Sequence, residues 1–157
     1  KERTLSLQMI FKRDIEENPD LNFRSKKIRP IKGEEPEMQL LFRHLTTEEI
    51  EVSEQGSTYC KRVFEKERSQ RLHWIRYHLE EHKKDNIEIF SVKTRDQKKR
   101  QDIIRTYIYD KEQKYVIVLD PHRSKRDYYL LTAYHLNKEY GEKQLLKKLK
   151  NKLPDIQ

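Results

Sequence analysis

The stretch IIRTYIYDKEQKYVIVL (residues 103–119) contains two runs of β-branched and aromatic residues, separated by four polar residues. Runs of this composition and length are typical of β-strands. The polar segment Asp110–Gln113 is short enough to connect two strands as a hairpin. The sequence therefore predicts an antiparallel pair, Ile103–Tyr109 and Lys114–Leu119.

Two further runs of the same kind flank this pair. IEIFSV (Ile87–Val92) precedes it, and DYYLLTAYHL (Asp127–Leu136) follows it after a charged connection that contains Pro121. A parallel strand pair needs a crossover connection of helix length, and none is present between these four runs. The four runs therefore predict a four-stranded antiparallel meander.

The apolar residues outside this region recur at helical spacing. Helices are predicted over residues 1–18, Glu37–Ile50, Thr58–Lys84 and Lys138–Leu153, and the segment Asp20–Pro36, which contains Pro30 and Gly33, is predicted to be a loop. Arg68 interrupts the apolar stripe of the third helix. The last helix carries many lysines, so its outer face is basic.

These elements predict an α+β fold, with N-terminal helices packed on one face of a four-stranded antiparallel sheet and a C-terminal basic helix. We expect residues 1–60 to form an N-terminal helical and loop extension, and residues 61–157 to form the main domain. The chain of 157 residues is of ordinary size for one domain core.

The net charge of +8 indicates an anionic partner, and a phosphate backbone is the commonest one. An acidic protein or an anionic membrane surface would satisfy the same charge. The single cysteine, Cys60, predicts neither an internal disulfide nor a zinc framework, which favours a reducing, cytoplasmic location. No apolar run is long enough to cross a membrane, so no membrane partner is expected.

Side-chain alternation predicts which strand residues could form a site. If Thr106 points into the core with its apolar neighbours, Arg105 and Tyr107 point to the opposite face of the sheet. On the last strand, Thr132 and Tyr134 share one side with Tyr128, and we expect this side to be the same open face. Aromatic and β-branched residues also favour strands for packing reasons alone, so a purely structural interpretation stays open.

His73 lies beside the apolar stripe of the predicted third helix, where it could reach toward the sheet. The other histidines are expected to be surface or capping residues: His44, His78, His82, His122 and His135. His78 and His82 have the i, i+4 spacing of metal ligands but lack a convincing third ligand. No metal and no other cofactor is therefore expected.

Four segments together resemble one known family. RSQRLHWIRYHLEEH (residues 68–82), RTYIY (105–109), YVIVLD (115–120) and DYYLLTAYHL (127–136) are similar in order and spacing to the metal-independent ribonucleases grouped as barnase–EndoU–colicin–RelE-like, in particular to their phage-encoded and polymorphic-toxin branches. The resemblance covers roughly residues 68 to 152. It implies a helical N-terminal part and a four-stranded antiparallel sheet, and a toxin-like or phage-associated endoribonuclease.

The resemblance also implies roles for individual residues. RNA would be cleaved by attack of the ribose 2′-hydroxyl on its own phosphate, which leaves a 2′,3′-cyclic phosphate. His73 would transfer a proton, Arg105 would neutralise charge on the phosphate, and Thr132 would donate a hydrogen bond to it. Tyr134 would hold or stack on the base. We expect the His73 imidazole within about 10 Å of the Thr132 hydroxyl.

Further basic and aromatic residues are expected to contact RNA: Arg76, Tyr107, Arg123, Lys125, Arg126 and Tyr128. An acidic immunity protein or antitoxin is a second expected partner. Two alternatives to the nuclease stay open at this point. One is a nucleic-acid-binding module that lacks the chemistry, and the other is an interaction domain whose basic face meets an acidic protein.

Overall fold

The computed structural model describes residues 2–33, 35–97, 99–122, 124 and 126–157. The fold is α+β, as predicted. Its helices are α1 (Glu2–Phe11), the π-helix η1 (Lys12–Glu16), α2 (Glu37–Thr46), α3 (Lys66–Gln70), α4 (Trp74–Leu79) and α5 (Glu139–Lys150). Its strands are β1 (Asn22–Phe23), β2 (Lys26–Pro30), β3 (Thr47–Glu54), β4 (Ser57–Phe64), β5 (Ile87–Asp96), β6 (Gln101–Asp110), β7 (Tyr115–Pro121) and β8 (Asp127–His135).

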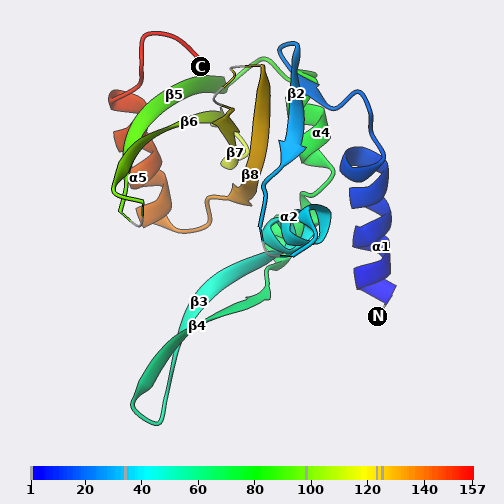
Figure 1. Cartoon of the computed structure of the whole chain (residues 1–157), viewed down its shortest axis with the longest axis vertical. Coiled ribbons are helices and arrows are strands. Elements are labelled where there is room, and N and C mark those ends of the chain that lie inside the picture. The colour runs from blue at the N-terminus through cyan, green and yellow to red at the C-terminus, as the bar shows by residue number, and fades with distance from the viewer. Residues whose placement is uncertain (1, 34, 98, 123, 125) are drawn as a thin grey trace.

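The four predicted strands correspond to β5, β6, β7 and β8, which form the expected antiparallel meander (Figure 1). The sheet itself is wider than predicted, with six strands in the order β1-β2-β8-β7-β6-β5. Its centre is β7, in which the five residues Tyr115–Leu119 are all buried. A central strand with both faces covered has a continuous run of apolar residues in its sequence, and KYVIVL shows this pattern.

The two additional strands come from the segment Asp20–Pro36, which was wrongly predicted to be a loop. Arg24 and Ser25 have positive φ angles and turn the chain between β1 and β2. β2 then pairs in parallel with the first half of β8, and Ile28 enters the core. Parallel pairing with a strand a hundred residues away leaves no local sequence signal. The predicted extension and main domain thus share one sheet.

The predicted helix Thr58–Lys84 is also wrong in its first part. Residues 57–64 form β4, which pairs with β3 across a turn where Gln55 and Gly56 have φ angles of 50° and 81°. Gly56 tolerates this left-handed conformation because it lacks a Cβ atom. The β3–β4 hairpin projects away from the body of the molecule (Figure 1). Only α3 and α4 remain of the long helix.

The terminal helices match the sequence more closely. The N-terminal helix continues from α1 through η1, which ends at Glu16 with Glu17 as its C-cap, shortly before Asn18 and Pro19, as predicted. The C-terminal helix, predicted over Lys138–Leu153, is α5. No helix among the described residues combines the length and the apolar character needed to cross a membrane.

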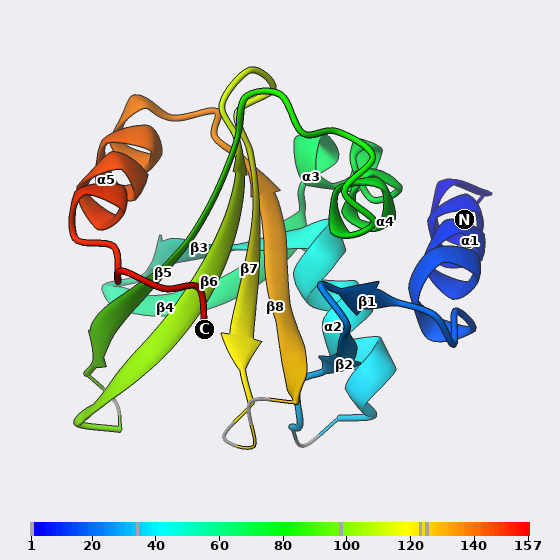
Figure 2. The same cartoon turned by 90° about the horizontal axis from the view of Figure 1, so that it is seen from above.

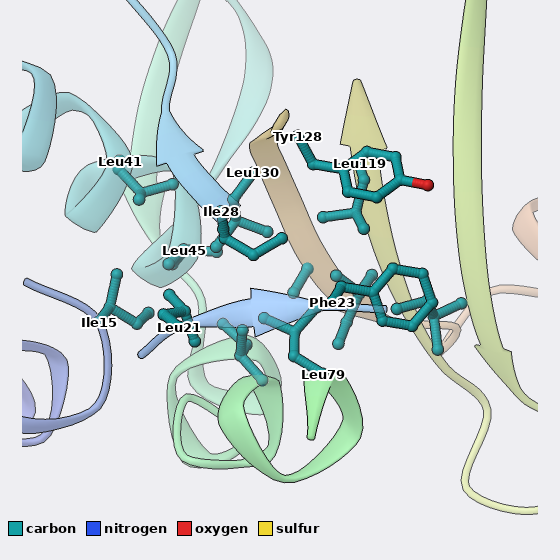
Figure 3. Packing of buried hydrophobic residues seen from close by; sticks show 14 of the residues in the cluster. Ile15, Leu21, Phe23, Ile28, Leu41, Leu45, Leu79, Leu119, Tyr128 and Leu130 are labelled. Carbon is teal, nitrogen blue, oxygen red and sulfur yellow. The ribbon is translucent and has the colours of Figure 1, made fainter. Parts of the chain in front are cut away.

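Helices cover both faces of the sheet and not one face, as Figure 2 shows. On the face that we call the α2–α4 face, α2 and α4 pack against Ile108, Ile117 and Leu130, and residues of β1 and β2 complete this core (Figure 3). On the opposite face, which we call the α5 face, Leu145 and Leu149 of α5 pack near Val116 and Val118. The strands between them therefore carry apolar residues on both sides.

Candidate nucleic-acid interface

Four of the predicted site residues lie on the α5 face. Register pairs Tyr107 with Val118, and Val118 in turn with Thr132, while Val116 pairs with Tyr134. Paired residues in a sheet point to the same side, and Val116 and Val118 belong to the α5-side core. Arg105 pairs with Val92 of the same core. The structure thus brings Arg105, Tyr107, Thr132 and Tyr134 to one face, as alternation predicted.

Tyr128 is not on this face, because a β-bulge interrupts the alternation of β8. Leu119 pairs with Leu130 and Val118 pairs with Thr132, which leaves Leu131 as an extra residue between them. Tyr128 and Leu130 consequently pack in the α2–α4 core. The Tyr128 ring is buried beside Phe23 (Figure 3), and its hydroxyl donates to the backbone carbonyl of Gln157. Its predicted stacking on RNA does not fit this position.

Arg68 joins the predicted residues on the α5 face. Its guanidinium carbon lies 5.9 Å from the centre of the Tyr134 ring, and its Nη1 donates to the backbone carbonyls of His44 and Thr47 at 2.8 and 2.7 Å. Its Nε is buried without a hydrogen-bond partner among the described residues. Burial lowers the pKa of Arg68. The signal was present in the sequence, since Arg68 interrupts an otherwise apolar stripe.

Arg105, on β6, has an environment similar to that of Arg68. Its Nε is buried and lacks a partner within the described part of the chain. Burial raises the pKa of Tyr134 to about 12; Tyr107 acts in the same direction, and the Arg68 and Arg105 charges oppose it. Two guanidinium groups therefore act on one phenol. Burial also raises the pKa of Asp120, which the Arg105 charge opposes.

His44 on α2 stands at the margin of this group. Burial lowers its pKa, and the charges of Arg62, Arg43 and Arg68 lower it further, while a hydrogen bond to the backbone of Leu131 opposes the shift. The His44 side chain therefore lies beside the backbone of β8 at Leu131. No sequence pattern separates His44 from the other histidines. We call the set His44, Arg68, Arg105, Thr132 and Tyr134 the basic–aromatic cluster.

Tyr107 lies on the same face of the sheet as this cluster, but its ring is buried and is not available to a base. The ring is 2% exposed and stacks on Phe90 with 5.2 Å between ring centres. Lys148 of α5 lies 5.2 Å from the centre of the same ring, and its Nζ donates to the Tyr107 hydroxyl at 3.2 Å. A base could stack on Tyr107 only if α5 moved away.

His73 and Arg76 lie elsewhere. Both line a hollow of about 760 Å³ beside α4, on the α2–α4 side of the sheet. His73 is exposed, and its neighbours Leu72 and Trp74 pack toward that side. His73 therefore lies on the α2–α4 side of the sheet, whereas Thr132 lies on the α5 face. Arg76 pairs with Glu80 at 2.7 Å and with Asp14 at 3.7 Å.

The same hollow contains a buried His78–Asp110 pair that has a structural role. His78 Nε2 lies 3.0 Å from the Asp110 carboxylate, and its Nδ1 donates to the carbonyl of Trp74 at 2.8 Å. Asp110 also accepts from Lys83 at 2.9 Å. Both ring nitrogens are therefore occupied, which leaves none to transfer a proton to a ligand.

The remaining predicted contacts lie in the connection between β7 and β8. Arg126 is exposed there. Arg123 and Lys125 fall outside the described residues. Within the described residues, no group of three or more histidine, cysteine, aspartate or glutamate side chains is placed to hold a metal ion.

The arrangement on the α5 face suits an anion. Guanidinium groups present fixed donors to phosphate oxygens, and aromatic rings beside them favour nucleic acid among the phosphate-bearing ligands. Comparison of the chain with models of known families, with curated proteins and with solved structures finds no match.

Proposed function

We propose that the protein is a metal-independent endoribonuclease that binds single-stranded RNA at the basic–aromatic cluster. One observation carries the proposal: the charges of two guanidinium groups, Arg68 and Arg105, act on Tyr134, and each group has a buried Nε without a partner in the described chain. A buried donor without a partner is costly, and a phosphate oxygen would satisfy it. The resemblance to metal-independent ribonucleases adds the reaction.

The cluster offers a group for each step of that reaction. His44, whose pKa is lowered, is neutral near pH 7 and would accept the proton of the ribose 2′-hydroxyl. The 2′-oxygen would form a bond to phosphorus as the bond to the 5′-oxygen breaks. Tyr134 is protonated at that pH and would donate its proton to the leaving 5′-oxygen. Arg68 and Arg105 would stabilise the charge on the phosphate oxygens.

A second candidate is an RNA-binding module without catalysis. It is favoured by the position of His73, because the histidine that the resemblance implies for proton transfer lies across the sheet from Arg105 and Thr132. In that case the cluster would bind phosphate, and His44 would have no chemical role. Cleavage of RNA separates the two candidates directly.

The experiment uses a labelled single-stranded RNA of mixed sequence with EDTA present. We expect fragments that end in a 2′,3′-cyclic phosphate, and we expect His44→Gln to slow their formation by about 10²-fold. His73→Gln is the matched control, since it makes the same change at the other histidine and should cleave normally. Circular dichroism verifies that both variants fold.

Two results would contradict the proposal. If the wild-type chain binds RNA but never cleaves it, the non-catalytic module is the better description. If His73→Gln loses activity while His44→Gln retains it, the reaction takes place in the hollow beside α4 and not at the cluster.

A further inference from the structure

A second basic surface lies between α5 and β5, outside the cluster. It is a hollow of about 630 Å³ with nine lining residues, among them Lys93, Tyr140, Lys143, Gln144, Lys147 and Lys148. Four of these nine residues are lysines, and none is acidic. We call this surface the lysine groove.

Helical geometry explains why the groove is basic. Residues three, four, seven and eleven apart lie on one side of a helix, and this spacing relates Tyr140, Lys143, Lys147 and Asn151. Leu145 and Leu149 occupy the side that packs on the sheet. One helix therefore docks through its leucines and lines the groove with its lysines and amides.

The charges of the groove are only partly neutralised. Lys93 pairs with Asp102 at 3.1 Å, and Lys143 reaches Glu139 only at 4.0 Å. Lys147 has no ion-pair partner among the described residues. In the hollow beside α4, by contrast, Arg13, Arg76 and Lys83 each pair with a carboxylate. The lysine groove is therefore more favourable for binding an external anion than the hollow beside α4.

Lys148 connects the lysine groove with Tyr107, a buried neighbour of the cluster. This side chain lines the groove, and it also bonds the hydroxyl of Tyr107. Tyr107 in turn acts electrostatically on Tyr134 of the cluster. A strand of RNA bound at the cluster could therefore continue over α5. Tyr140, 72% exposed at the end of this path, offers a ring face to an unpaired base.

We propose that the lysine groove is a second phosphate-binding site, which holds the backbone of single-stranded RNA next to the segment bound at the cluster. This inference rests on the proposed function, since it takes RNA as the ligand. Lys143 and Lys147 contact successive phosphates, and the amides of Gln144 and Asn151 donate to the same backbone. Contacts of this kind add affinity without base preference.

The test measures binding of two RNA probes in which 2′-deoxy sugars prevent cleavage, one of four and one of twenty nucleotides. The wild-type chain should bind the longer probe more tightly. Lys143→Gln/Lys147→Gln should weaken binding of the longer probe by tenfold or more at low salt. The slope of log affinity against log salt should become less steep by about 1.4, because each lost phosphate contact removes about 0.7. Binding of the shorter probe should hardly change.

Lys150→Gln/Lys152→Gln is the matched control, because it removes the same charge from exposed residues near the end of α5 that do not line the groove. Equal losses in the two double variants would overturn the inference, because net charge alone would then explain the effect. Equal affinity of the wild-type chain for both probes would also overturn it. So would polyglutamate binding as tight as the longer probe, which would indicate an acidic protein as the occupant.

These outcomes are separate from those of the proposed function. A wild-type chain that does not cleave RNA, but whose affinity for the longer probe falls only in Lys143→Gln/Lys147→Gln, contradicts the nuclease and leaves the groove in place. A chain that cleaves RNA but responds equally to both double variants contradicts the groove and leaves the nuclease in place.

Discussion

The polar groups of Asp110 on one face of the sheet and of Arg68 and Arg105 on the other differ in how completely they are hydrogen-bonded. On the α2–α4 side, the buried Asp110 is surrounded by donors from His78, Lys83 and the backbone. On the α5 side, Arg68 and Arg105 carry buried Nε atoms with no partner among the described residues. Satisfied charges hold a fold together, whereas unsatisfied ones lower stability and mark a surface that gains from a ligand. Arg71 Nε and His135 Nδ1 are also buried without a partner in the described chain, so the proposed site depends on the two arginine charges that act on Tyr134 and not on an unpartnered atom alone.

The largest expected effect is a loss of stability when a charge on the α2–α4 side is removed. Asp110→Ala removes a carboxylate that is 0% exposed, which leaves His78 Nε2 without its acceptor and Lys83 with Glu112 alone. Losing one partner of a buried pair costs about 3 to 5 kcal/mol of the free energy of unfolding, which urea denaturation measures. RNA affinity should be unchanged once the protein is folded.

Asp102→Ala is the control for this prediction. Asp102 bonds Lys93 and Arg95 on the surface, where solvent screens such pairs, so its loss should change the urea midpoint very little. If the two variants lose equal stability, the buried pair has no special structural role.

Removing a charge on the α5 side should have the opposite effect on the free energy of unfolding. Arg105→Met keeps the aliphatic stem and removes a guanidinium whose Nε has no partner, so the free energy of unfolding should stay the same or rise by about 1 kcal/mol. RNA affinity should fall about tenfold or more, and cleavage should fall further. Denaturation and binding measured on one preparation give both values.

Arg95→Met serves as the comparison here, because Arg95 is an exposed strand arginine already paired with Asp102 at 3.3 Å. It should alter RNA affinity much less than Arg105→Met. A marked loss of stability in Arg105→Met would mean that its guanidinium is satisfied within the fold, and the distinction between the two faces would fail.

The smallest expected effect is a pH dependence. Burial lowers the pKa of His44 and of His135 below the ordinary value of 6.5. The unfolded chain therefore takes up protons before the folded chain does, and stability falls as the pH drops below about 6.5. Thermal unfolding between pH 5 and pH 8 measures this, and His44→Gln should reduce the slope.

The rate of cleavage should also fall as the pH drops, because only neutral His44 accepts a proton. Activity should decline as acidification protonates His44, while RNA binding itself should strengthen slightly as positive charge increases. A cleavage rate that stays constant from pH 8 to pH 5 would contradict the role of His44 as the base.

Strand prediction succeeded where local sequence determines structure. The runs that became β5 to β8 are β-branched and aromatic, they are connected by short polar segments, and pairing between neighbours in the chain needs no long-range information. Failure occurred where pairing is distant or local patterns are ambiguous. β2 depends on β8, and the run Thr58–Phe64 fits a helix or a strand until its partner Thr47–Glu54 is known.

For the candidate site, the sequence by itself determined that Arg105 shares a face with Tyr107, and Thr132 with Tyr134, because strand alternation requires it; the strand register decided that both pairs lie on one face. It also marked Arg68 as an exception in an apolar stripe. Only the tertiary structure decided that Arg68 approaches Tyr134, that a bulge at Leu131 turns Tyr128 to the opposite side, and that His73 lies beyond the sheet. Alternation is a property of the local backbone, whereas the facing of separate elements depends on how the whole core packs.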